Sequence, residues 1–137
     1  MPLIVKQPSS PAVQQWMAQD PEIVIWTLTP VEIVSALRRL VRSGQLEEDE
    51  ASRAESLLIE FAKRCHLIVD VELVKAIACR VLRVHSLRAA DALQLGAALA
   101  WAGSNTQGNI LHTFDQQLAV AAGREGFESP RLHGGSR

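Results

Sequence analysis

Three acidic side chains stand where they could do chemistry together. Asp91 lies in the first turn of a predicted helix that is apolar on nearly every side, and Glu32 and Asp115 each closely follow an apolar run. Carboxylates that converge repel one another, so such a cluster needs a cation. Oxygen ligands with no His or Cys expected in reach favour Mg²⁺ or Mn²⁺. A site of this kind suits phosphodiester hydrolysis by a metal-activated water.

Each acid also has a purely structural explanation. Asp91 could interact with the positive end of its helix dipole, with Ser86 as the cap. Thr29 and Glu32 have the spacing of a capping box, and Asp115 could cap the last helix. Capping alone explains three acids at three such junctions less readily than a shared site does.

The elements expected to position the acids alternate between strands and helices, which predicts an α/β fold with a parallel β-sheet flanked by helices. In such sheets, functional groups gather at the carboxyl ends of the strands. The run at 22–29 is β-branched and continuously apolar in its middle, as in a strand buried on both faces. We predict strands over 22–29, 66–70 and 109–113, and helices over 11–20, 30–42, 46–64, 72–84, 86–101 and 115–124.

Length and charge limit the class of protein. The chain has 137 residues, which predicts a single domain over 1–137 with a flexible tail over 130–137. Its formal net charge is −1, which does not fit a non-specific nucleic-acid binder. Any contact with RNA must be local, and Arg38, Arg39 and Arg42 could supply it. Alternatively, these arginines lie on a solvated helix face and bind no RNA.

The sequence favours a cytoplasmic protein with no membrane partner. Cys65 and Cys79 have no metal-finger spacing and are expected to be buried free thiols in a reducing compartment. The N-terminus has no signal-peptide pattern. The apolar helix over 86–101 is too short to span a bilayer.

Three segments resemble the three downstream motifs of PIN domains in order, spacing and flanking apolar residues. They are TPVEIVSAL at 29–37, LRAADALQL at 87–95 and LHTFDQQLA at 111–119. The closest group is the VapC-type ribonuclease toxins, and the resemblance covers essentially the whole chain. The second motif is fairly specific, the third moderately so, and the first is weak alone.

The resemblance implies a PIN-like three-layer sandwich and a metal-dependent endoribonuclease, the toxin of a type II toxin–antitoxin system. Glu32, Asp91 and Asp115 would be the catalytic acids that hold Mg²⁺ or Mn²⁺. Arg88 and Thr113 would be supporting residues at the substrate. The implied partners are the RNA substrate, a cognate antitoxin protein and a second copy of the chain in a homodimer.

The chain departs from this family in one respect. The family begins with a central strand that ends in Asp-Ser/Thr-Ser, and that aspartate is the first of four acids. Here the sequence starts at what resembles the first helix, so we expect the strand and the fourth ligand to be absent. Two possibilities stay open: an active endoribonuclease, or a catalytically impaired, truncated PIN-like protein that retains only antitoxin-binding or dimerisation surfaces.

Overall fold

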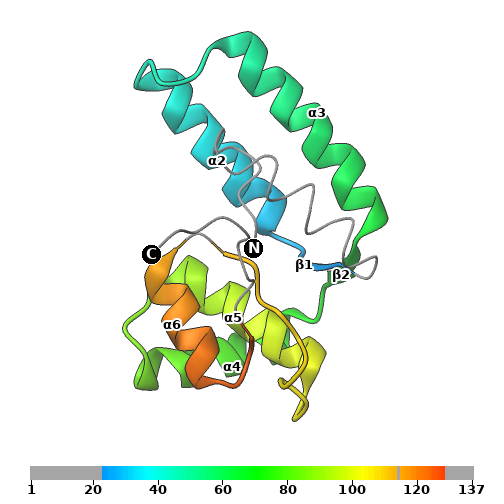
Figure 1. Cartoon of the computed structure of the whole chain (residues 1–137), viewed down its shortest axis with the longest axis vertical. Coiled ribbons are helices and arrows are strands. Elements are labelled where there is room, and N and C mark those ends of the chain that lie inside the picture. Colours follow the sequence, from blue (N-terminus) through cyan, green and yellow to red (C-terminus); the bar gives the residue numbers. More distant parts are fainter. Residues whose placement is uncertain (1–22, 114, 129–137) are drawn as a thin grey trace, which may run out of the picture. The chain divides into compact units, whose positions relative to one another are not determined.

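The computed structural model describes residues 23–113 and 115–128, which contain five helices and two strands (Figure 1). The α/β class predicted from the sequence is confirmed. The chain divides into two compact units, one ending at Val69 and the other beginning at Asp70. Each unit is described by itself. The predicted helix over 11–20 and the predicted tail lie outside the described residues.

The first unit contains a small parallel sheet whose two strands are joined by a helical hairpin (Figure 1). Parallel strands need a long crossover connection, and the two helices supply it. In the register of the sheet, Ile25 lies opposite Leu67. Both strands fall inside the predicted ranges but are shorter. The elements are β1 (Val24–Trp26), α2 (Thr29–Arg42), α3 (Glu48–Arg64) and β2 (His66–Ile68).

The helical hairpin packs through one apolar stripe on each helix. The spacing of Ile33 and Leu37 places them on one face of α2, and both are buried. Leu58 of α3 is buried in the same cluster. Partly buried side chains such as Leu40 and Ala54 surround it. Amphipathic periodicity predicts this contact well because each helix has a single apolar face.

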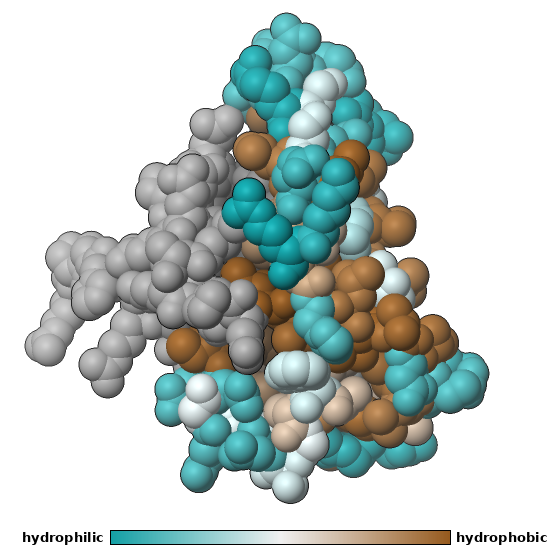
Figure 2. Space-filling view, turned by 90° about the vertical axis from the view of Figure 1, so that its right-hand side faces the viewer, coloured by the Kyte–Doolittle hydropathy of each residue, from teal (hydrophilic) through white to brown (hydrophobic). Residues whose placement is uncertain are grey.

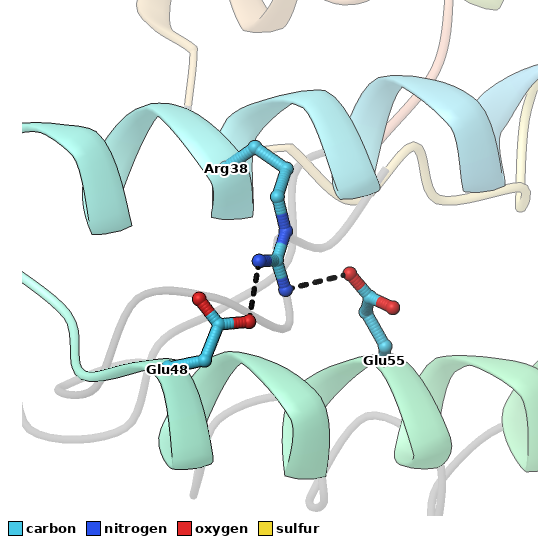
Figure 3. A network of polar contacts seen from close by, with 3 residues as sticks. All are labelled: Arg38, Glu48 and Glu55. Carbon is cyan, nitrogen blue, oxygen red and sulfur yellow. Dashed lines mark hydrogen bonds and ion pairs between the residues drawn. The ribbon is translucent and has the colours of Figure 1, made fainter.

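Arg38 connects the two helices of the hairpin (Figure 3). Its Nη1 donates to Oε1 of Glu48 at 2.6 Å, and its Nη2 donates to Oε1 of Glu55 at 3.0 Å. The hydrogen bonds to Glu48 and then to Glu55 raise the pKa of the Arg38 guanidinium above its ordinary value. Arg38 is therefore engaged within the chain. Contact with RNA at this stretch stays a prediction for the exposed Arg39 and Arg42.

The second unit is built from three helices around one apolar core. They are α4 (Val71–Val84), α5 (Ala89–Ala102) and α6 (Gln116–Arg124). Leu95 and Leu118 are among its fully buried side chains. A Cβ built on Gly96 would lie 2.9 Å from the backbone oxygen of Val74 and 3.2 Å from the nitrogen of Ala78. The missing side chain at Gly96 therefore allows α4 and α5 to approach closely.

Two local predictions in this unit are wrong. The run at 109–113 forms no strand, and only an isolated parallel bridge joins Ile110 to Glu128. A short apolar run becomes a strand only where a partner continues beside it, and the described residues supply only this one pairing. The apolar helix begins at Ala89, and its N-cap is Arg88 rather than Ser86.

The cysteines also differ from the prediction. Cys79 is exposed, because it is turned away from the buried stripe of α4 that includes Ala78. Cys65 is half-buried, and burial raises the pKa of its thiol to about 11. Both thiols are free.

Within the described ranges, no helix combines the length and hydropathy that crossing a bilayer requires. α5, with 14 residues, is about 21 Å long at about 1.5 Å per residue. The hydrocarbon core of a bilayer is about 30 Å thick.

Replacing Gly96 by alanine tests the close helix approach. We expect Gly96→Ala to lower the free energy of unfolding by about 1–3 kcal/mol, because the new methyl group meets backbone atoms that cannot rotate away. The matched control is Gly123→Ala in α6, where a Cβ would meet nothing within 4 Å. The control should gain up to about 1 kcal/mol from helix propensity. Urea denaturation measures both, and equal effects would show that packing at Gly96 is unimportant.

Candidate functional site

Asp91 lies in the first turn of α5 but does not cap it. The cap is Arg88, whose backbone oxygen accepts from the Ala92 nitrogen at 2.9 Å. Burial raises the pKa of the half-buried Asp91 carboxyl, and the charge of Asp115 raises it further. The positive charge of Arg88 acts in the opposite direction. Asp115 is thus near enough for its charge to act on Asp91, which capping alone does not require.

Asp115 is the N-cap of α6, so its structural explanation is confirmed. Its Oδ1 accepts from the Leu118 nitrogen at 2.8 Å. The Asp115 backbone nitrogen donates to Oγ1 of Thr113 at 3.1 Å, which helps hold the start of the helix. Capping occupies one carboxylate oxygen of this exposed side chain. It is compatible with a second role for the other oxygen.

Glu32 lies half-buried in the first turn of α2, in the first unit. The capping box predicted for it is wrong, because the N-cap is Leu28 and makes no side-chain capping bond. Thr29 is the first helical residue, and its buried hydroxyl has no hydrogen-bond partner among the described residues. A capping box forms at α3 instead, between Glu47 and Glu50. A shared site for Glu32 and the other two acids stays a prediction.

The second unit therefore brings together two of the three predicted acids, with Arg88 beside Asp91 and Thr113 bonded to Asp115. The donor set fits a hard divalent cation, because carboxylate oxygens are its usual ligands and a cation would relieve the repulsion between them. Among residues 23–113 and 115–128, no group of three His, Cys, Asp or Glu side chains has the arrangement of a metal site.

A buried charge cluster escaped the sequence analysis. The His85 side chain is only 5% exposed, and its Nε2 lies 2.8 Å from Oε2 of Glu125. Nη2 of Arg80 donates to Oε1 of the same carboxylate at 2.9 Å. The Arg80 hydrogen bond, aided by His85, lowers the pKa of Glu125 despite its burial. No local pattern could have revealed this cluster, because His85 and Glu125 are separated by 40 residues.

No family model matches the chain, and no curated protein matches it. The resemblance to PIN domains remains a prediction from the three motifs.

The pH dependence of stability tests the coupling between Asp91 and Asp115. Because the folded-state pKa of Asp91 is raised, its ionised form costs stability at neutral pH. The cost disappears as pH falls through the folded pKa to the ordinary value of about 3.9. We expect Asp91→Asn to raise the free energy of unfolding at neutral pH by about 1 kcal/mol or less, since solvent screens the pair.

The measurement is urea denaturation in a chelator at neutral pH and at about pH 4, where the gain should be smaller. A loss of several kcal/mol in the Asn variant would instead identify Asp91 as a structural residue.

Two substitutions at Asp115 separate its capping from its charge. Asparagine caps a helix about as well as aspartate does, so Asp115→Asn should keep the fold and remove the repulsion with Asp91. Asp115→Ala should lose about 1 kcal/mol because the Leu118 amide loses its acceptor. Thermal denaturation measures both, with Asp70→Ala as the control at the N-cap of α4, where Oδ1 accepts from the Leu73 nitrogen at 3.1 Å. Equal losses in both Asp115 variants would contradict a separate role for the charge.

Proposed function

We propose that the protein is a metal-dependent endoribonuclease that hydrolyses RNA phosphodiester bonds, similar to the VapC toxins of type II toxin–antitoxin systems. The observation that supports this most directly is the electrostatic coupling of Asp91 with Asp115. These are the two acids of the more specific motifs. Asp115 stabilises α6 as its cap, but the repulsion between the two nearby carboxylates is unfavourable without a cation, so the pair suits a cation site.

Each site residue has a distinct role in this proposal. Asp91 and Asp115 hold Mg²⁺ or Mn²⁺, and Glu32 is the third acid. When bound, the metal activates a water and neutralises charge on the phosphate. Arg88 is exposed at the start of α5, where its guanidinium can bind a phosphate oxygen of the RNA. Thr113 positions Asp115 through the hydrogen bond from the Asp115 backbone.

Exposed apolar side chains at the two ends of α4 support the proposed protein partners and also favour a second candidate function. Four large apolar side chains of this helix are exposed. Apolar residues at the surface are brown in Figure 2. Val84 is 63% exposed. Side chains of this kind suit a cognate antitoxin or a homodimer contact. The second candidate is accordingly a catalytically impaired PIN-like protein that only binds such partners. The four residues are Val71, Leu73, Leu82 and Val84.

Cleavage of single-stranded RNA with Mg²⁺ or Mn²⁺ tests the proposal. Asp91→Asn and Asp115→Asn should each lower the cleavage rate by at least about 100-fold, because each removes a charged ligand of the metal that would activate the water and neutralise charge on the phosphate. Glu32→Gln tests the third acid in the same way. Asp70→Asn is the matched control, since Asp70 also caps a helix of this unit but belongs to no motif. It should cleave like the original protein.

A metal titration gives a readout that does not depend on activity. Mn²⁺ should raise the melting temperature of the original protein and of Asp70→Asn, because a ligand that binds the folded state stabilises it. The rise should be lost in Asp91→Asn. Folded protein that neither cleaves RNA nor responds to either metal would favour the second candidate.

A further inference from the structure

A pocket of about 270 Å³ lies in the second unit, beside the buried His85. One wall comes from the connection between α4 and α5, and the other from one face of α6. Val120 and Ala121 form the apolar part of the α6 wall. The polar lining residues are His85, Ser86, Gln116, Gln117 and Arg124.

The side chains of the α6 wall have complementary chemistry. Gln117, Val120 and Arg124 follow one another at spacings of three and four, so they share one helix face. A glutamine amide donates and accepts hydrogen bonds and can pair with the edge of a nucleobase. An arginine binds phosphate oxygens in a bidentate manner. An apolar side chain between them can lie against the flat face of a base.

The charge around the pocket favours an anionic ligand. Arg80 compensates the negative charge of Glu125 at 2.9 Å, and Nε2 of His85 lies 2.8 Å from the same carboxylate. Arg124 is exposed and takes part in none of the ion pairs found among the described residues. Its positive charge is therefore available to a phosphate. The contact between Nε2 and Glu125 holds the His85 ring in place at the wall of the pocket.

Each wall of the pocket contains residues that are close in sequence to an acid of the candidate site. Gln116 directly follows Asp115, so their Cα atoms are about 3.8 Å apart. Ser86 comes two residues before Arg88, the cap of the helix that carries Asp91. A strand of RNA whose phosphate lies at the two carboxylates can thus place a neighbouring nucleotide in this pocket.

We propose that the pocket binds one nucleotide of a single-stranded RNA substrate next to the bond that is cleaved. The base lies against Val120 and pairs with the amides of Gln116 and Gln117, and a phosphate binds Arg124. Pockets for drug-sized ligands begin at about 300 Å³, so this volume suits one nucleotide rather than several. The inference rests on the proposed RNA hydrolysis and deepens it by assigning where the substrate is held.

Binding of a short fluorescein-labelled single-stranded RNA, followed by fluorescence anisotropy, tests the pocket. The background is Asp91→Asn in EDTA, in which the RNA stays intact. Gln117→Ala and Arg124→Gln should each raise the Kd about tenfold, the expected loss for one bidentate contact. Both side chains are exposed, so the variants should keep the fold. Arg83→Gln, at an exposed arginine of α4 outside the pocket, is the matched control and should bind normally.

Cleavage by the same variants with Asp91 intact separates this inference from the proposed function. Weaker RNA binding in the pocket variants alone supports the pocket, whether or not the protein cleaves. If the protein cleaves RNA and the pocket variants bind and cleave normally, the pocket inference is overturned and the nuclease stands. If pocket-dependent binding occurs without cleavage in either metal, the proposed hydrolysis fails and the pocket stands. Absence of any RNA binding overturns the pocket inference.

Discussion

The close approach of α4 and α5 at Gly96 is the contact on which the second unit depends. Backbone atoms of Val74 and Ala78 occupy the space that a side chain at Gly96 would need. Because the helices are close, the small residues of α5 are buried between them. Leu95 of α5 and Leu118 of α6 belong to the same core. A rigid core of this kind fixes where α5 and α6 begin, and those are the places that carry Asp91 and Asp115.

The two acids show how a structural role and a chemical role can occupy one residue. Asp115 uses one oxygen to cap α6, which stabilises the helix. Burial raises the pKa of Asp91, and the charge of Asp115 raises it further, which is unfavourable for the folded chain. Arg88 already occupies the cap position, so Asp91 can stabilise the start of α5 only through the helix dipole, against the cost of its burial and of the nearby Asp115 charge. Residues that cost stability are found most often at functional sites.

Local signals in the sequence were enough to predict much of this architecture. Patterns in the sequence predicted the five described helices to within a few residues of their ends, and the apolar runs at β1 and β2 predicted the parallel pair. Helix periodicity depends on neighbours three and four residues away, so it is visible without knowledge of the fold. The motifs also pointed to Asp91 and Asp115, which the structure places near each other.

Other features could be known only from the tertiary structure, because they depend on contacts between distant segments. The run at 109–113 has a strand-like composition, yet it makes only one bridge because a strand needs a neighbour along its length. The ion pair of His85 with Glu125, and the pocket beside it, join residues 40 positions apart. A sequence pattern records the spacing of residues along the chain, whereas such contacts depend on how the helices pack.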